Sequence, residues 1–266
     1  MIEKAIEVLE RLKKEVPLVH AITNYVAINN NANALLSIGA SSAMVMSPEE
    51  TYDFTAISDT LYVNIGTINN ETKEAIIKSV ISAKDHKKPV VIDPVGCAAI
   101  KSRVDFVNML LKIGEISIIK GNVAEIKSLV GESANVKGVD SLDDSGNIDS
   151  CVKLARLTNT TVVATGKEDY ISDGRRVVKV NNGTNLFTKI TGAGCTLGAI
   201  MAATSACGDD KVISSLAALL VMNIAGELTE KESNLPGTFS TKFIDNLYIL
   251  NSDMIRKYAD IEVLGV

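Results

Sequence analysis

Residues 191–199, which read T-G-A-G-C-T-L-G-A, place closely spaced glycines and a cysteine at the start of a helical pattern. The backbone N–H groups of a first helical turn have no partner within the helix. In this segment they would belong to Gly192, Ala193, Gly194 and Cys195. Glycines let an anion approach the backbone closely, and the positive end of the helix dipole attracts it. The segment therefore predicts a phosphate site or, equally, an ordinary helix start with small packing residues.

Neither of the two common phosphate-loop patterns is present. Gly198 comes one position too late for G-x-G-x-x-G, and no acidic residue follows at the expected distance. The chain also contains no G-x-x-x-x-G-K-[ST] motif. If the segment binds phosphate, it does so neither as a dinucleotide-binding loop nor as a Walker loop.

The composition excludes several classes of protein. A chain of 266 residues with 46% apolar and 22% charged residues is typical of a folded globular protein. Because no linker divides the chain, the sequence predicts one domain over residues 1–266, with a domain plus a small subdomain as the second choice. The net charge of -5 argues against a nucleic-acid surface, because no basic cluster is denser than residues 84–88.

The cysteines and the apolar runs indicate where the protein resides. The four cysteines lie far apart without a C-x-x-C pair or a nearby histidine, so we expect neither a structural zinc site nor a disulfide. Residues 1–15 lack the apolar run of a secretory signal, which favours the cytoplasm. The longest apolar run, residues 212–225, contains polar residues and is too short for a membrane span, so it predicts a core helix.

Short β-branched runs alternate with longer segments of helical period. We expect strands at residues 42–45, 61–64, 89–93, 116–120 and 161–165, and a hairpin of residues 170–172 and 176–180. The helical segments are expected at residues 25–38, 71–86, 102–113, 122–130, 148–158, 192–206, 211–229 and 240–258. This alternation predicts an α/β fold with a mostly parallel sheet, helices on both faces and an antiparallel ribbon at one end.

Ligands of such sheets bind beyond the carboxyl ends of the strands. Four strand ends carry residues that suit this purpose. They are Met44, the Asp93-Pro94-Val95-Gly96 segment, the Lys120-Gly121-Asn122 segment and the Thr165-Gly166 pair.

The glycine segment and four others resemble the hydroxyethylthiazole kinases, a branch of the ribokinase-like superfamily. The other segments are residues 20–41, 91–96, 118–126 and 162–174, in the family's order and approximate spacing. The resemblance implies a ribokinase-like three-layer sandwich without a separate lid. It also implies ATP-dependent phosphorylation of the primary alcohol of 4-methyl-5-(2-hydroxyethyl)thiazole in thiamine biosynthesis, by a homotrimer that uses Mg²⁺.

The resemblance also implies roles for individual residues. Met44, Asn24 and Gly192 match the thiazole side, and Lys120, Thr165 and Asn122 match nucleotide-binding positions, although the family often has arginine at the position of Lys120. Asn122 and Glu125 fit the superfamily's N-x-x-E pattern near Mg²⁺. Most members of the superfamily carry aspartate at the position of Cys195. Two departures are the absence of the usual proline before Met44 and the less glycine-rich segment 235–239.

Each of these residues also has a simpler interpretation. Asp93 could hold Mg²⁺ or cap the turn that follows it, and Glu125 could hold Mg²⁺ or complete a capping box with Asn122. Lys120 could be a solvated residue at the end of a strand, and Asn24 could serve only as a helix cap. Met44 could simply pack in the core.

Cys195 is the least usual residue of the set. A thiol at a helix N-terminus has its pKa lowered by the dipole, so Cys195 is expected to be thiolate often enough to accept the substrate's hydroxyl proton. The alternative is a small apolar helix residue. Phosphoryl transfer does not depend on a strong base, because positioning and electrostatics carry most of the catalysis. The main catalytic groups are therefore expected to be the backbone amides of Gly192, Ala193, Gly194 and Cys195, with the sulfur only assisting.

Other functions fit parts of the sequence. Cys195 could be the nucleophile of an acyl-transfer enzyme with His20 as its base, or the fold could be a vitamin or nucleotide sensor. Within the kinases, the substrate could be another small hydroxylated heterocycle of the pyrimidine or pyridoxal type. Because no strands are left over for a lid, we expect a neighbouring subunit to cover the site.

Overall fold

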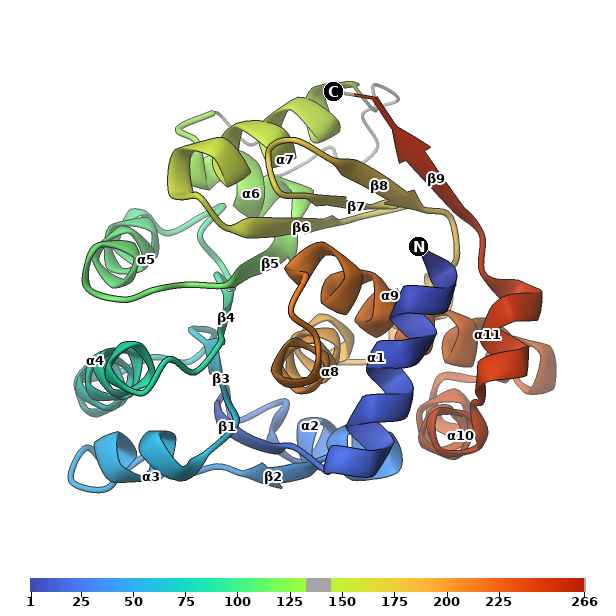
Figure 1. Ribbon diagram of the computed structural model, residues 1–266, viewed down its shortest axis with the longest axis horizontal. Helices are drawn as coiled ribbons and strands as arrows, with labels where there is room; N and C mark the ends of the chain where they lie inside the picture. The colour runs from blue at the N-terminus through green and yellow to red at the C-terminus, as the bar shows by residue number, and fades with distance from the viewer. Residues whose placement is uncertain (133–144, 266) are drawn as a thin grey trace.

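The computed structural model describes residues 1–132 and 145–265. Its strands form a single nine-stranded sheet in the order β2-β1-β3-β4-β5-β6-β7-β8-β9 (Figure 1). Strands β1 to β6 run parallel to one another, and each of the pairs β6–β7, β7–β8 and β8–β9 is antiparallel. The strands are β1 (Leu18–Ile22), β2 (Ser41–Ala43), β3 (Thr60–Asn64), β4 (Val90–Asp93), β5 (Ile118–Asn122), β6 (Thr161–Thr165), β7 (Asp169–Ser172), β8 (Val177–Val180) and β9 (Ile261–Leu264).

Helices cover both faces of this sheet and make a three-layer sandwich (Figure 1). One layer contains α3 (Thr51–Ile57), α4 (Asn70–Asp85), α5 (Lys101–Ile113), α6 (Val123–Leu129) and α7 (Ser145–Thr158). The other contains α1 (Ile2–Glu15), α2 (Ile28–Ser37), α8 (Ala193–Cys207), α9 (Lys211–Glu232), α10 (Pro236–Ile249) and α11 (Ser252–Tyr258). The expected α/β class and the mostly parallel sheet are confirmed, and the described strands include no separate lid.

The alternation of side chains along each strand decides which residues face α8. On β3, Leu61 and Val63 belong to the core on the α4 side, whereas Tyr62 belongs to the core around α8. Asn64 is two residues beyond Tyr62 and therefore faces α8 as well. The same period places the last residues of β4, β5 and β6 toward α8, because Val91, Ile118 and Val163 lie in that core.

Helix α9 is the core helix that the apolar run predicts, but it is longer than expected. By length and composition alone, this helix of 22 residues could cross a membrane, but 89% of its apolar 18-residue stretch is buried inside the fold. The Asp210 side chain caps its first turn by accepting from the backbone N–H of Val212 at 3.0 Å. The same carboxylate forms an ion pair with Arg176 from the β7–β8 hairpin. This ion pair connects the start of α9 to the antiparallel end of the sheet.

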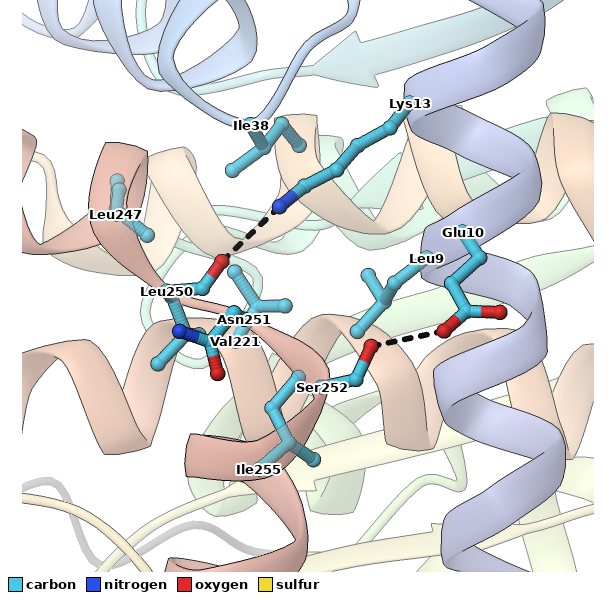
Figure 2. Close-up of a pocket in the computed structure, with 10 residues that line it drawn as sticks. All are labelled: Leu9, Glu10, Lys13, Ile38, Val221, Leu247, Leu250, Asn251, Ser252 and Ile255. Carbon is cyan, nitrogen blue, oxygen red and sulfur yellow. Dashed lines mark hydrogen bonds between the residues drawn. The ribbon is translucent and has the colours of Figure 1, made fainter.

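The prediction of one helix over residues 240–258 is wrong, because α10 and α11 are separate helices. The Lys13 ammonium donates to the carbonyl of Leu250 at 3.0 Å, where α10 ends. Asn251 then caps α11 by accepting from the backbone N–H of Met254 at 3.0 Å. Figure 2 shows the small cavity that this junction leaves between α1, α9 and α10, with the bond from Lys13 to Leu250 at its edge.

Two strands have no counterpart in the sequence prediction. Strand β1 lies inside the sheet between β2 and β3, but its short run contains His20, which hides the apolar pattern. His20 is buried, with Nδ1 2.8 Å from Thr55 Oγ1 and Nε2 2.8 Å from the carbonyl of Val45. Strand β9 pairs with β8 and extends the expected hairpin into a three-stranded antiparallel ribbon.

Candidate active site at the first turn of α8

The carboxyl ends of the central strands converge beneath the N-terminus of α8. Asn64 of β3 and Asp93 of β4 are direct neighbours in the sheet register, as are Asn122 of β5 and Thr165 of β6. Helix α8 packs on β1, β3 and β4, so its first turn faces these strand ends. The fold thus brings the predicted glycine segment and the predicted strand-end residues to one edge of the sheet.

The first turn of α8 presents backbone N–H groups that have no acceptor within the helix. Gly192 is the N-cap residue in the left-handed region at φ 80° and ψ 3°, a conformation that favours glycine. The first helical bond runs from the N–H of Thr196 to the carbonyl of Gly192 at 2.8 Å. The N–H groups of Ala193, Gly194 and Cys195 precede that bond, and Gly194 is exposed at the surface. This turn has the geometry of an anion site.

Asp93 lies beneath this turn, and one of its two oxygens receives all the neighbouring donors. Its Oδ2 is 3.1 Å from the Tyr62 hydroxyl, 3.2 Å from Asn64 Nδ2 and 3.3 Å from Lys120 Nζ. Its Oδ1 is buried and has no hydrogen-bond partner among the described residues. Burial raises the pKa of Asp93, and the Lys120 ammonium acts against that rise. A buried carboxylate oxygen without a partner is a suitable ligand for a cation or its bound water.

Lys120 is part of this buried group and not the solvated strand-end residue of the simpler interpretation. It is 3% exposed, and its Nζ donates to the carbonyl of Gly194 at 2.9 Å as well as to Asp93. A Cβ atom at Gly194 would lie 3.1 Å from Nζ, so the glycine gives the ammonium its room. Burial lowers the pKa of Lys120, but Asp93 and Glu125 raise it by more, so the ammonium keeps its charge directly under the turn.

Cys195 has an environment opposite to the one that the sequence suggests. Burial, with the nearby Asp93 carboxylate, raises the pKa of the thiol, so the expected lowering by the helix dipole does not decide its charge. Asn24 Nδ2 donates to Sγ at 3.1 Å. Asn24 also caps the turn before α2, since its Oδ1 accepts from the N–H groups of Val26 and Ala27 at 3.1 Å each. Asn24 therefore has a capping role and also contacts the site.

The capping box suggested for Asn122 and Glu125 is present. Glu125 Oε2 accepts from the N–H of Asn122, and Asn122 Oδ1 accepts from the N–H of Glu125, both at 2.9 Å. Glu125 Oε1 accepts from the N–H of Gly96 at 2.9 Å, so both carboxylate oxygens are already hydrogen-bonded. Burial, followed by the charge of Asp93, raises the pKa of Glu125. Glu125 therefore holds the loop after β4 through Gly96, and it lies close enough to Asp93 for that carboxylate to raise its pKa.

The described residues contain no cluster of three or more histidine, cysteine, aspartate or glutamate side chains able to enclose a metal ion. Asp93 and Glu125 supply two carboxylates. Protein sites for Mg²⁺ often use one or two carboxylates, with water and substrate phosphates as the remaining ligands. The residues present fit a Mg²⁺ ion that arrives with a nucleotide.

The other predicted residues lie near the same edge but make fewer contacts within it. Met44 follows β2 and packs, partly buried, against the core around α8. Thr165 ends β6, and its hydroxyl donates to the carbonyl of Gly121 at 3.3 Å. His20 is held by Thr55 and Val45, so both of its ring nitrogens are engaged away from Cys195. This geometry gives no support to His20 as a base for Cys195.

The sequence interpretation missed Tyr62 and Asn64. The Tyr62 hydroxyl and the Asn64 amide both contact Asp93 Oδ2, and both side chains are almost completely buried. The available signal was the strand end itself, because Asn64 closes β3 in the same way that Asp93 closes β4. Tyr62 gave no signal beyond that of an aromatic residue in a strand.

Comparison with known proteins agrees with this geometry. Residues 9–253 match the model of the hydroxyethylthiazole kinase family. The chain belongs to the hydroxyethylthiazole kinase family. It is 49% identical over 256 residues to hydroxyethylthiazole kinase 1 of Clostridium botulinum strain Hall, an alignment that covers 96% of this chain and 97% of the relative. It is 46% identical over 263 residues to the hydroxyethylthiazole kinase of Clostridium novyi strain NT, with 98% and 99% covered.

Solved structures support the same family and fold. The hydroxyethylthiazole kinase protein of Pyrococcus horikoshii OT3 superposes with a TM-score of 0.92 at 36% identity, covering 99% of this chain and 100% of the other. A ribokinase-like superfamily protein of Enterococcus faecalis V583 superposes with a TM-score of 0.64 at 18% identity, with 88% of each chain covered, and shows the shared fold alone. The expected ribokinase-like sandwich and the expected hydroxyethylthiazole kinase family are both confirmed.

Proposed function

We propose that this chain transfers the γ-phosphoryl group of ATP to the hydroxyl of 4-methyl-5-(2-hydroxyethyl)thiazole, giving the thiazole phosphate and ADP as a step of thiamine biosynthesis. The observation that carries this proposal is the open first turn of α8 directly above a buried lysine, in a chain whose residues 9–253 match the hydroxyethylthiazole kinase family. No other function considered for the sequence accounts for both features.

The γ-phosphoryl group binds at the first turn of α8. In the transition state its charge spreads over the equatorial oxygens, where the N–H groups of Ala193, Gly194 and Cys195 can stabilise it. Lys120 adds a positive charge beneath the same turn, because its ammonium already contacts the carbonyl of Gly194 at 2.9 Å. Asn122 and Thr165 lie side by side at the next strand ends and bind the remainder of the nucleotide.

Asp93, whose Oδ1 is unpaired among the described residues, would hold a Mg²⁺ ion that accompanies ATP, and Glu125, whose own oxygens are hydrogen-bonded, would support it from further away. Such an ion would supply neutralisation of phosphate charge. The buried donors around Oδ2 keep the Asp93 carboxylate in place, so that Oδ1 remains available for the ion.

The thiazole alcohol binds between Met44, Asn24 and Gly192. The sulfur of Met44 gives a polarisable surface for the heterocycle. Asn24 holds the Cys195 sulfur by donating to it at 3.1 Å. Since the pKa of Cys195 is raised, the thiol is largely protonated before transfer. Only the minor thiolate fraction can accept the hydroxyl proton, which converts it to the thiol as the new phosphate bond forms.

The substrate is tested by measuring ADP release with the thiazole alcohol, with hydroxymethylpyrimidine and with pyridoxal at equal concentrations. We expect kcat/KM to be highest for the thiazole alcohol and turnover to require ATP. A higher kcat/KM for either competitor would replace the proposed substrate, and turnover of an acyl substrate without ATP would replace the proposed reaction.

We also propose a homotrimer whose subunits cover each other's sites. Exposed apolar side chains lie on the neighbouring helices α2 and α10 and on the turn before α2, which adjoins the glycine segment. They include Tyr25, Val26, Leu36 and Tyr248, which are 64%, 57%, 60% and 72% exposed. Several large exposed apolar residues on adjacent elements are consistent with an association surface. A monomer with full activity in analytical ultracentrifugation coupled to the ADP assay would refute this part of the proposal.

Finally, we propose that residues 1–266 form one kinase domain that works in the cytoplasm. All four cysteines are free thiols, which suits a reducing compartment. Limited proteolysis that yields two stable fragments, each with its own unfolding transition, would contradict the single domain.

A further inference from the structure

We propose that Tyr62 and Asn64 are positioning residues that hold Asp93 and the first turn of α8 in one fixed arrangement. This inference rests on the proposed function, because it assigns Tyr62 and Asn64 a role in the same phosphoryl-transfer site. Neither residue belongs to the glycine segment or to the strand ends that the sequence singled out. Each is linked by hydrogen bonds to both sides of the site.

The side-chain amide of Asn64 uses all of its hydrogen-bonding capacity. Its Oδ1 accepts from Asn24 Nδ2 at 2.9 Å and from the backbone N–H of Gly66 at 3.0 Å. Its Nδ2 donates to the Tyr62 hydroxyl at 3.0 Å and to Asp93 Oδ2 at 3.2 Å. Rotating the amide by half a turn would place its donors against the Asn24 and Gly66 donors, so only one orientation is compatible with the site.

That fixed orientation also determines where Asn24 points. The Oδ1 of Asn24 accepts hydrogen bonds from the turn before α2, so the Nδ2 of the same amide faces the site with its two hydrogens. One of these donors goes to Asn64 Oδ1 and the other to Cys195 Sγ. A continuous chain of hydrogen bonds thus runs from Asp93 through Asn64 and Asn24 to the Cys195 sulfur.

Tyr62 connects the same carboxylate to the backbone of α8. Its hydroxyl lies 3.1 Å from Asp93 Oδ2 and 2.9 Å from the carbonyl of Cys195. The ring is completely buried against Gly198, where a Cβ atom would come within 2.5 Å of the ring and 2.6 Å of the hydroxyl. Gly198, the third glycine of the segment, therefore has a purpose unrelated to phosphate, because it makes room for Tyr62.

These contacts explain why the donors around Asp93 gather on Oδ2. Tyr62, Asn64 and Lys120 approach that oxygen, and Oδ1 is left buried without a partner among the described residues. Tyr62 and Asn64 thereby decide which carboxylate oxygen is available to ligands. They act through Asp93 and Cys195 and do not need to touch a substrate themselves.

The first test is kinetic. Tyr62→Phe removes the hydroxyl but keeps the ring against Gly198. We expect kcat to fall by about tenfold or more, because the hydroxyl that lies between the Asp93 carboxylate and the Cys195 carbonyl is lost. We expect KM for ATP and for the thiazole alcohol to stay within about twofold. The matched control is Tyr52→Phe, since the Tyr52 hydroxyl also donates to a carboxylate, Asp85, at 2.8 Å but on the surface. An unchanged kcat in Tyr62→Phe, or an equal loss in Tyr52→Phe, would overturn the proposal.

The second test is a crystal structure of Asn64→Ala, which does not depend on the identity of the substrate. We expect the Asp93 carboxylate to rotate and the Asn24 amide to leave the Cys195 sulfur. Retention of both side chains in their present positions would overturn the proposal even if the enzyme phosphorylates the thiazole alcohol. If Asn64→Ala does not fold, the structure of Tyr62→Phe answers the same question for Asp93 and for the Cys195 carbonyl. A wild-type enzyme without thiazole kinase activity would refute the proposed function and leave this structural test intact.

Discussion

Replacing Lys120 with methionine should destabilise the protein strongly, because it leaves a buried carboxylate without its counter-ion. Asp93 and Lys120 form an ion pair at 3.3 Å whose side chains are 1% and 4% exposed. Removing one partner of a buried pair costs about 3–5 kcal/mol of unfolding free energy. One kcal/mol shifts Tm by roughly 2–4 °C in a protein of about this size, so Lys120→Met should lower Tm by roughly 6–20 °C.

The assay is thermal unfolding without nucleotide, followed by the ADP-release assay. The matched control is Lys101→Met, because Lys101 pairs with Asp105 at 3.2 Å with side chains 88% and 60% exposed. An exposed pair contributes about 0–1 kcal/mol, so the control should change Tm by less than roughly 4 °C.

A double variant separates stability from catalysis. Asp93→Asn combined with Lys120→Met replaces the buried pair by uncharged groups, and we expect it to regain most of the lost Tm because no buried charge remains unpaired. It should not regain activity, since both charges proposed to act on the nucleotide are gone. A Tm for Lys120→Met no lower than that of Lys101→Met would contradict the prediction, because Asp93 and Lys120 would then not be coupled in the folded protein.

Substitutions at Asp169, Cys195 and Gly198 each have an expected effect. Burial raises the pKa of Asp169 to about 6, so its contribution to stability is present at low pH and is lost as pH rises from about 4 to about 6. In denaturant titrations, the unfolding free energy of wild type minus that of Asp169→Asn should decrease by roughly 2 kcal/mol over this range. A difference that increases with pH would contradict this expectation. Cys195→Asp should retain ADP release and Cys195→Ala should lose much of it; an alanine variant with unaltered turnover would end the proton-acceptor role of the sulfur. Gly198→Ala should destabilise the protein by about 1–3 kcal/mol in denaturant titrations, because the added methyl group meets Tyr62, and it should also lower kcat for ADP release. The control is Gly237→Ala, where a Cβ would meet nothing within 4 Å, and it should change neither quantity.

The sequence predicts most of the layered fold because its strands are short, continuous apolar runs. Residues 61–64 and 161–165 show the pattern of strands buried on both faces, and both are strands in the structure. Strand β1 could not be found in this way, since His20 interrupts its apolar run and is satisfied by Thr55 and Val45, which are remote in sequence. At the break between α10 and α11, the Asn251 cap is local, whereas the bond from Lys13 to the Leu250 carbonyl comes from the other end of the chain.

The candidate site was predictable where its residues end strands. Asp93 and Lys120 were found by this rule, but their mutual contact was not, because the pairing of β4 with β5 and the position of α8 above them are tertiary features. The charge state of Cys195 was misjudged for a related reason. The helix dipole can be read from the local sequence, whereas burial and the nearby Asp93 carboxylate, which raise the pKa, cannot.

The most direct test is a crystal structure of the wild-type enzyme with a non-hydrolysable ATP analogue and Mg²⁺. We expect oxygens of the terminal phosphate to lie within about 3 Å of the backbone nitrogens of Ala193, Gly194 and Cys195, on the side of α8 that faces Lys120. A terminal phosphate bound elsewhere, with that first turn left to solvent, would contradict it.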